Sequence, residues 1–412
     1  MKNSPLSLES KIPDKVPLVV GINTYDFGST GMVAISALKG YEQSGYATLL
    51  ICDEHKGLYK SEYHIGGSWI YRQFNRALCR INGSDGFHNK KATKKLLSFL
   101  ANKNVAAFHL HNIHSFYLNL PLILQFAEEH QIPVIWTIHD CWFFTGRCSH
   151  FQECKNWQRH CGHCPNKAIY PRTFFFDRSA EFLKQKLSLV KSLKDKLIVV
   201  CPSEWIAREL SYSNFKDVTH QVIHNGISLN QTTVGKTPCD KKRLLFVASP
   251  FTERKGLRYA EKLSRELPGD RFELHIVGDI KENCSFGVAA KLYGKVSDRQ
   301  KLFSIMQNCD IFVNPTLDDN FPMTNLEALS SGIPVITFDT GGSGEAINLE
   351  TGTIVKKGDY QALKESILKF DPHKYSPEKC IERAALFSEK TMTDSYVALL
   401  NYLTKKDSCT TK

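Results

Sequence analysis

The sequence predicts an α/β protein made of two doubly wound domains, each with a parallel sheet. Short apolar runs such as Ala47–Cys52 and Phe272–Val277 alternate with amphipathic stretches of about ten residues, which is typical of strands alternating with crossover helices. These runs end in glycine-rich or polar loops, and ligands of such sheets bind at the carboxyl ends of strands. At 412 residues, the chain is long enough for two or three domains. We therefore expect two Rossmann-like domains that face each other across a cleft.

A polar stretch containing Gly235 and Pro238 divides the two sets of alternating elements. We expect residues 1–228 to form the amino-terminal domain, 229–242 a linker, and 243–412 the carboxyl-terminal domain. The cysteine-rich segment 141–165 reads as an insertion in the first domain. The last helix is expected to pack back onto that domain.

Composition narrows the class of binding partner and the cellular compartment in which the protein is expected. The amino terminus lacks the apolar run of a signal peptide, and no other stretch is long and apolar enough to span a bilayer, so we expect a cytoplasmic protein. The first 228 residues carry 27 basic and 18 acidic side chains, against 26 and 24 in the remainder. The basic excess suits anionic lipid headgroups, a phosphate-bearing acceptor or nucleic acid, with a merely solvated surface as the plain alternative.

The segment 311–345 carries the strongest functional signal. A strand from Ile311 is stopped by Pro315, and a short helix follows between Pro322 and Gly332. Amides at the start of that helix are suited to a phosphate, because they are unpaired and lie at the positive end of the helix dipole. The residues that supply these amides are Met323, Thr324 and Asn325.

Two carboxylates frame this phosphate site. Asp319 lies in the loop and Glu327 in the second turn of the helix, so both can reach one polyhydroxylated ligand. Alone, the pair would read as a turn former and a solvated helix residue. In the same domain Lys255 precedes Gly256 at a helix start and is placed to reach a diphosphate, with Arg254 as a helper; a solvated lysine is the alternative.

The amino-terminal domain offers weaker signals. Gly28 and Gly31 follow the first strand and would let backbone approach a ligand, although an ordinary strand-to-helix turn explains them as well. His139 ends a buried strand, where a role in the catalytic cleft competes with a capping pair formed with Asp140. The imidazoles of the segment HLHNIHS lack a nearby carboxylate or cysteine to complete a metal site, so we interpret them as polar groups that face an acceptor.

Four cysteines in a short aromatic loop could hold a structural zinc ion in tetrahedral geometry. Reduced buried thiols are the alternative, and neighbouring histidines could replace one thiol. A zinc ribbon in a basic half would also suit nucleic-acid binding, but that function leaves the carboxyl-terminal motif unexplained. The cysteines, spaced C-x5-C-x6-C-x2-C, are Cys148, Cys154, Cys161 and Cys164. After them, residues 177–196 read as an amphipathic surface helix whose apolar face is surrounded by lysines, Lys186 among them.

The chain resembles family 4 glycosyltransferases of the GT-B fold, most closely those of bacterial capsule, colanic acid and exopolysaccharide assembly. The resemblance covers nearly the whole length and is carried by HLHNIHSFYLN, WTIHDCWFFTGRC, VVCPSEWIA, VIHNGIS, ERKGL, YGKVSD and DDNFPMTNLEALSSGIPVITFDTGGSGE. It implies transfer of a hexose-type sugar from a UDP- or GDP-sugar to a saccharide acceptor, with lipid-linked acceptors in view. It also implies retention of anomeric configuration, no cofactor required for catalysis, and no nucleic-acid partner.

The same resemblance assigns roles to residues. Glu327 would bond the nucleotide ribose, Lys255 the diphosphate, and Asp319 and His139 the sugar. Val296, within YGKVSD, would also contact the donor. A lipid-linked acceptor places the protein at the anionic inner face of the membrane. An inactive sugar-nucleotide-binding scaffold is the rival interpretation.

Two positions depart from the family pattern. Ser249 and Pro250 stand where members commonly carry Gly-Arg, which removes a second diphosphate cation unless Arg254 supplies it. Asp319 is one methylene shorter than the usual Glu, which would alter the choice of donor.

Overall fold

The computed structural model describes residues 16–65, 69–229, 236–281, 283–287 and 289–410. The chain divides into two compact units. The first comprises Met1–His224 with Met392–Lys412, and the second comprises Asn225–Thr391. Residues 230–235 of the expected linker lie outside the described residues.

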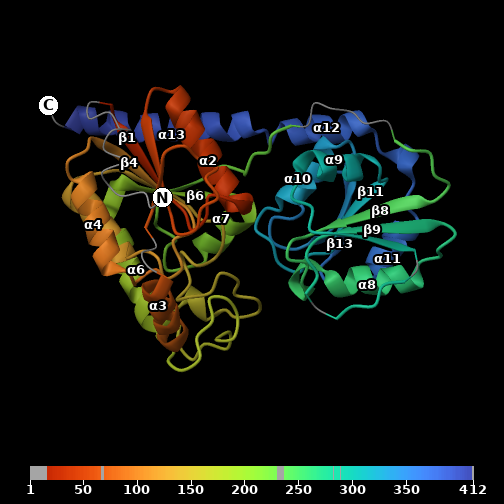
Figure 1. Cartoon of the computed structure of the whole chain (residues 1–412), viewed down its shortest axis with the longest axis horizontal. Coiled ribbons are helices and arrows are strands. Elements are labelled where there is room, and N and C mark those ends of the chain that lie inside the picture. The colour runs from red at the N-terminus through yellow and green to blue at the C-terminus, as the bar shows by residue number, and fades with distance from the viewer. Residues whose placement is uncertain (1–15, 66–68, 230–235, 282, 288, 411–412) are drawn as a thin grey trace. The chain divides into compact units, whose positions relative to one another are not determined.

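The first unit contains a seven-stranded sheet in the order β3-β2-β1-β4-β5-β6-β7 (Figure 1). Every neighbouring pair is parallel. The order reverses between β1 and β4, so their carboxyl ends mark the crevice where such sheets bind ligands. The strands are β1 (Leu18–Ile22), β2 (Ala47–Cys52), β3 (Glu62–His64), β4 (Val105–Leu110), β5 (Val134–Thr137), β6 (Leu197–Cys201) and β7 (His220–Val222).

Helices cover this sheet, and one apolar cluster of the core includes residues of β1, β4 and β5. The strands are buried on both faces, which explains why they read as continuous apolar runs rather than as an alternating pattern. The helices are α2 (Gly28–Gln43), α3 (Trp69–Asn82), α4 (Lys90–Leu100), α5 (Leu120–Glu129), α6 (Ser179–Leu193) and α7 (Glu204–Ser211), with short 3₁₀ turns η1 (Asn156–Gln158) and η2 (Lys194–Lys196).

The second unit contains a six-stranded parallel sheet in the order β10-β9-β8-β11-β12-β13. Its order reverses between β8 and β11. The strands are β8 (Lys242–Val247), β9 (Phe272–Val277), β10 (Ala290–Gly294), β11 (Ile311–Asn314), β12 (Val335–Asp339) and β13 (Gly352–Lys356). The helices are α8 (Leu257–Glu266), α9 (Arg299–Gln307), α10 (Met323–Ser330), α11 (Tyr360–Leu368) and α12 (Pro377–Ala385), with 3₁₀ turns η3 (Glu253–Lys255) and η4 (Pro372–Lys374).

The last helix, α13 (Glu389–Thr410), belongs to the first unit from Met392 onward. Tyr396 on α13 is fully buried, and its hydroxyl lies 2.9 Å from Thr137 Oγ1 at the end of β5. Gly40 on α2 lies against Thr393, because a Cβ at Gly40 would be 2.9 Å from the threonine Cβ. None of the helices in the described ranges is long and apolar enough to cross a membrane.

Candidate functional site

In the second unit, buried amides fix the start of α10 between the two strands beside it. Asn314 at the end of β11 donates to Asn325 Oδ1 at 2.7 Å, and Asn325 Nδ2 donates to the carbonyl of Ser343 at 2.8 Å. The backbone N–H of Asn325 donates to Pro322 at 3.1 Å. Asn325, predicted to offer its amide to a phosphate, is fully buried and already engaged in this way, so it positions the helix start. Met323 and Thr324 are partly exposed there.

Lys255 and Asp319 meet at the carboxyl ends of β8 and β11. The ammonium of Lys255 forms an ion pair with Asp319 Oδ2, and about a quarter of the lysine side chain stays exposed. Gly256 allows the two loops to approach, because its φ is +87° and a Cβ there would lie 2.4 Å from the carbonyl oxygen of Pro315. The structure therefore brings together the expected diphosphate cation and the expected sugar-facing acid.

Glycine also shapes the loop after β12. Gly341 has a φ of +56°, and a Cβ there would lie 1.7 Å from the carbonyl oxygen of Asp319. That carbonyl accepts a hydrogen bond from the N–H of Gly342 at 3.2 Å. The backbone that carries Asp319 is thus held on one side by the Gly341–Gly342 turn and on the other by Lys255.

Arg254 is held by the same loop. Its Nη1 donates to the carbonyl oxygen of Asp318 at 2.5 Å, and its own carbonyl accepts from the N–H of Leu317 at 2.7 Å. The guanidinium that would replace the Gly-Arg pair missing at Ser249–Pro250 is therefore tied to backbone, with part of its side chain still exposed.

Glu327 is the acid with the most perturbed ionisation in this unit. Burial raises its pKa to about 7, with Arg299 opposing the shift. No described residue donates a hydrogen bond to its carboxyl group. A carboxyl that is desolvated but left without a donor is more typical of a ligand site than of a structural contact. Arg299 was not singled out by sequence reasoning; its place directly after Asp298, the N-cap of α9, was the available signal.

An apolar wall lies beside these polar groups. Val296, in the loop after β10, and Met323, at the start of α10, are both partly buried and pack on the same apolar cluster around Phe321 and Leu326. Both expected donor contacts therefore pack on the same apolar cluster of the second unit.

In the first unit, the turn after β1 brings backbone close to the start of α2. Gly28 has a φ of +72°, and a Cβ at Gly31 would lie 2.7 Å from the carbonyl carbon of Asp26. The Asp26 carboxylate is buried and accepts from the amides of Lys56 and Leu58 at 2.8 to 2.9 Å. Both glycines are therefore required by the conformation of the turn itself.

His139 follows β5 and pairs with His111, which follows β4. Their Nε2 and Nδ1 atoms are 2.9 Å apart and the rings stack. Burial lowers the pKa of His139 to about 4, so both imidazoles are neutral at pH 7 and one donates to the other. His111 Nε2 is buried and has no hydrogen-bond partner among the described residues.

His109 has a structural role. Its Nδ1 lies 3.1 Å from the Tyr41 hydroxyl and its Nε2 lies 2.9 Å from Thr137 Oγ1, so both nitrogens are satisfied inside the core. Among the residues that the structure describes, no three metal-ligating side chains converge to hold an ion as placed.

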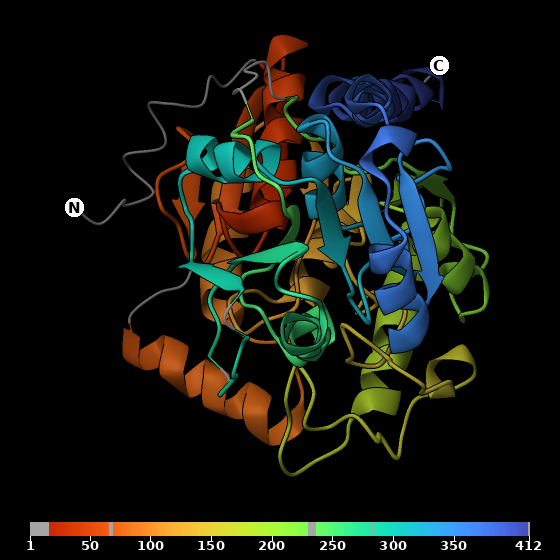
Figure 2. The same ribbon diagram turned by 90° about the vertical axis from the view of Figure 1, so that its right-hand side faces the viewer.

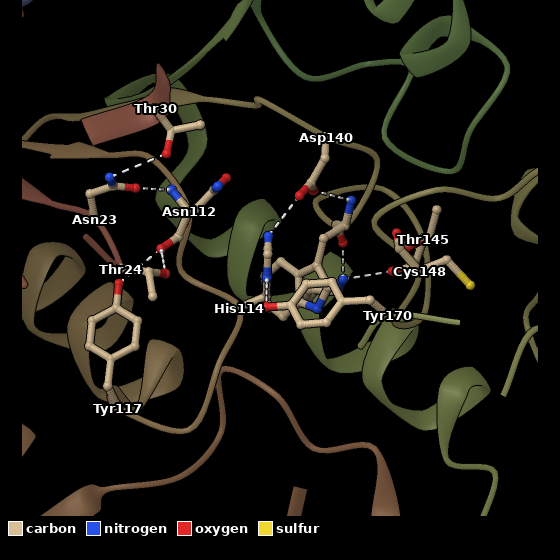
Figure 3. A network of polar contacts seen from close by, with 12 residues as sticks. Asn23, Thr24, Thr30, Asn112, His114, Tyr117, Asp140, Thr145, Cys148 and Tyr170 are labelled. Carbon is tan, nitrogen blue, oxygen red and sulfur yellow. Dashed lines mark hydrogen bonds and ion pairs between the residues drawn. The ribbon is translucent and has the colours of Figure 1, made fainter. Parts of the chain in front are cut away.

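His114 and Asp140 form an ion pair at the loops after β4 and β5. The His114 Nε2 to Asp140 Oδ2 distance is 2.7 Å, and Figure 3 shows His114 between Asp140 and the Tyr170 hydroxyl, 3.4 Å from Nδ1. Burial alone would raise the pKa of Asp140, but His114 and the amide of Trp142 outweigh it and lower the pKa to about 2. The His114–Asp140 ion pair therefore fixes the segment beside His139, so Asp140 does more than cap the end of the strand.

Asp85 and Tyr170 were missed by the sequence analysis. Within the described ranges Asp85 Oδ2 is buried without a hydrogen-bond partner, and burial raises the pKa of this acid although His114 opposes the shift. Both residues lie in segments without periodicity, so only tertiary contacts place them beside His114.

The four cysteines predicted as zinc ligands line one small cavity together with Trp157 and Arg147. The Cys148 thiol donates to Cys164, which lowers the pKa of Cys164. Cys161 Sγ accepts from the N–H of Gly146 at 3.1 Å. The thiols thus gather as expected, but their sulfurs are not arranged around one point, and the zinc ion stays a prediction.

Lys186 was expected on the solvated side of its helix, and that expectation is wrong. Its side chain is buried, and its ammonium donates to the carbonyl oxygen of Thr145 at 2.6 Å and to that of Trp142. It also lies 3.8 Å from the centre of the Trp142 ring. The buried loop carbonyls need a donor, so a lysine occupies a position where helical periodicity alone indicates solvent.

Two family models together match most of the chain. Residues 30–231 match the model described as Glycosyltransferase Family 4, and residues 232–387 match Glycosyl transferases group 1. The chain is 27% identical over 368 residues to the putative colanic acid biosynthesis glycosyl transferase WcaC of Escherichia coli K12, covering 82% of this chain and 86% of that protein.

Two further proteins are similar. An N,N'-diacetylbacillosaminyl-diphospho-undecaprenol α-1,3-N-acetylgalactosaminyltransferase of Campylobacter jejuni is 29% identical over 133 residues, which are 31% of this chain and 35% of that protein. The structure of HepE from Anabaena in complex with UDP has a TM-score of 0.62 at 14% identity and covers 94% of this chain and all of that one. With two parallel sheets that each reverse at a central crevice, the chain belongs to the family 4 glycosyltransferases of the GT-B fold.

Proposed function

We propose that this glycosyltransferase of polysaccharide biosynthesis moves a hexose-type sugar from a UDP- or GDP-sugar to a lipid-linked saccharide, with retention. The observation that carries the proposal is the Lys255–Asp319 ion pair, followed in the chain by α10, on which the carboxyl group of Glu327 has a raised pKa and no hydrogen-bond donor among the described residues. HepE, a structural neighbour, was solved with UDP, and one relative is named for a diphospho-undecaprenol acceptor. Both support the substrate classes proposed here.

The donor would be held by complementary charges. Lys255 leaves Asp319 for the diphosphate, which frees the Asp319 carboxylate to accept hydrogen bonds from sugar hydroxyls. Glu327 in its ionised form accepts from the ribose hydroxyls. Val296 and Met323 supply the apolar wall beside the base or ring.

The transfer step requires a bond from the sugar C1 to the acceptor oxygen and loss of the bond from C1 to the diphosphate. Lys255 and the free amides at the start of α10 stabilise the negative charge that develops on the departing diphosphate. The acceptor hydroxyl attacks from the face that the diphosphate leaves, and its proton passes to a phosphate oxygen. This front-face course gives retention without a covalent enzyme intermediate.

The acceptor would be held by the first unit. His139 would face the sugar with its neutral imidazole, supported by His111 and by the His114–Asp140 pair. The basic excess of this half suits a substrate with a lipid diphosphate. A lipid-linked acceptor also places the enzyme at the inner face of an anionic membrane.

A screen against UDP- and GDP-sugars tests the proposal. The purified protein is incubated with each donor, with and without lipid-linked acceptor, and nucleoside diphosphate release is measured. One nucleotide class should support acceptor-dependent turnover, and proton NMR of the product should show the donor's anomeric configuration. Tight donor binding without turnover on any acceptor would favour an inactive scaffold, and an inverted product would exclude the front-face course.

A further inference from the structure

Helix α3 presents an apolar face to solvent. Trp69, Ile70, Phe74 and Ile81 are 72, 74, 59 and 38% exposed. The spacing of Ile70, Phe74, Ala77 and Ile81 is that of one helical stripe, and Ala77 is exposed as well. The buried residues Asn75 and Cys79 lie on the opposite face. The packed face of α3 therefore already faces the protein, and its outer apolar stripe has no partner among the described residues.

A second exposed segment continues this stripe. Phe174, Phe175 and Phe176 are 58, 70 and 62% exposed. The segment is fixed to the end of α3, because the N–H of Phe174 donates to the carbonyl of Arg80 at 2.7 Å and that of Phe176 to the carbonyl of Ile81 at 3.0 Å. We call Trp69, Ile70, Phe74, Ile81 and Phe174–Phe176 the aromatic surface. Figures 1 and 2 show α3 at the end of the first unit opposite α13.

A basic pocket lies beside the aromatic surface. It has a volume of about 480 Å³, and its lining includes Asn82 at the end of α3, Arg178 just after Phe176, and Lys90 and Lys94 on α4. No acidic residue lines it. The Arg178 guanidinium is paired with Glu181, but in the described part of the chain neither lysine pairs with a carboxylate. The pocket therefore has uncompensated positive charge.

We propose that the aromatic surface docks on a lipid bilayer and that the basic pocket takes the phosphate of an anionic phospholipid headgroup. Aromatic side chains favour the level of the headgroups, and an apolar helix face beside lysines is typical of helices lying in the bilayer interface. The pairing of the two features favours a bilayer over a second copy of this chain, because two basic pockets would repel each other.

The inference deepens the proposed function, since a lipid-linked acceptor is met at the bilayer, but it can be tested without any sugar transfer. Flotation of the full-length protein with vesicles of phosphatidylcholine, with or without phosphatidylglycerol, measures binding directly. The wild type should bind the mixed vesicles more tightly. Phe175→Ser/Phe176→Ser should weaken binding to both kinds of vesicle at least tenfold.

The pocket is tested with Lys90→Glu/Lys94→Glu. This variant should lose the preference for phosphatidylglycerol, a loss of tenfold or more because each basic residue near an anionic surface contributes about 1 kcal/mol. Lys191→Glu/Lys216→Glu, exposed lysines elsewhere on the first unit, has the same charge change and should retain most of the preference. Leu349→Ser, a leucine that is 89% exposed on the second unit, is the control for lost apolar area. All four variants change exposed side chains and should melt at the wild-type temperature.

Several outcomes would overturn the inference. The first is that the wild type binds no vesicles. The second is that Phe175→Ser/Phe176→Ser binds vesicles as tightly as the wild type. The third is that both lysine variants lose the preference for phosphatidylglycerol to the same extent. A dimer that dissociates in the aromatic variant would assign the surface to a second copy instead. Nucleoside diphosphate release with a soluble acceptor, measured without vesicles, should be unchanged in all variants. If the wild type binds vesicles but releases no nucleoside diphosphate, the proposed function is refuted and the membrane-docking inference stands.

Discussion

At the scale of single residues, two opposite charges of the proposed donor site neutralise each other. Lys255 and Asp319 satisfy each other, whereas Glu327 has no hydrogen-bond donor and a raised pKa. The sequence motif identified all three, because each has a fixed offset from a proline or glycine. Motif spacing could not show that Asn325 is buried and engaged or that Lys186 is buried, since both depend on which distant carbonyls need a donor.

Removal of the Lys255 charge should mainly lower the turnover rate. Lys255→Ala deletes the cation for the departing diphosphate, and comparable electrostatic groups are worth about 10²- to 10³-fold in kcat.

Asp319→Glu should change the ranking of donors that share one nucleotide, because the carboxylate moves by one methylene. Steady-state kinetics with several donors check both variants, and Lys255→Arg should restore part of kcat. Wild-type kinetics for Lys255→Ala would contradict the donor site.

Donor affinity should depend on pH through Glu327. Its pKa is raised to about 7, so the carboxylate that accepts ribose hydrogen bonds is half formed near neutrality and becomes dominant as the pH rises. The donor Kd should therefore fall between pH 6 and pH 8 and level off above. Calorimetric titration with the nucleoside diphosphate measures this. Glu327→Gln, which cannot ionise, should bind more weakly and show a flat profile, and an unchanged slope in that variant would assign the titration to another group.

At the scale of elements, buried parallel strands were the most predictable feature. The expected ranges Ala47–Cys52 and Phe272–Val277 coincide with β2 and β9, because continuous apolar runs bounded by polar loops leave little choice. Helix α3 was not predicted, since its outward apolar face disguises the usual pattern. The edge strands β3, EYH, and β13, GTIVK, were missed because neither is a continuous apolar run.

The cysteine-lined cavity gives a prediction at this scale. Protein purified under reducing conditions should contain about one zinc ion per chain by elemental analysis if four thiolates complete a tetrahedral site. Cys161→Ser should abolish the metal and lower the melting temperature, whereas Cys284→Ser, which changes a thiol of the other unit, should do neither. Metal-free protein with unchanged stability would leave the cavity as a cluster of reduced thiols.

At the scale of the whole molecule, the chain leaves the first unit at His224 and returns to it at Met392. Repeated alternation of strands and helices was enough to predict two doubly wound sheets, since such a pattern has few other solutions. The packing of the last helix on the first domain was among the expectations. Its contacts could not be predicted, because the partner residues, Gly40 and Thr137, lie more than 250 residues earlier.

The contact between α2 and α13 should be sensitive to side-chain volume. Gly40→Val would place carbon against Thr393, whose Cβ already lies 2.9 Å from the position of an added Cβ. The cost should be about 1 to 3 kcal/mol of unfolding free energy, as for other overpacked contacts. Chemical denaturation measures it. The double variant Gly40→Val/Thr393→Gly should recover part of the lost stability. If Gly40→Val alone is as stable as the wild type, α13 can shift to accept the larger side chain without loss of unfolding free energy.

Because α13 packs on the first unit, that unit can be completed only after the second unit has been synthesised. A ribosome delivers the whole second unit before Tyr396 emerges, so the groove that receives this helix, with Thr137 and His109 beneath it, stays unfilled while about 170 residues are added. During that interval the surface that α13 later covers stays open to solvent and to chaperones. The amino-terminal half of the enzyme matures last, although it is made first.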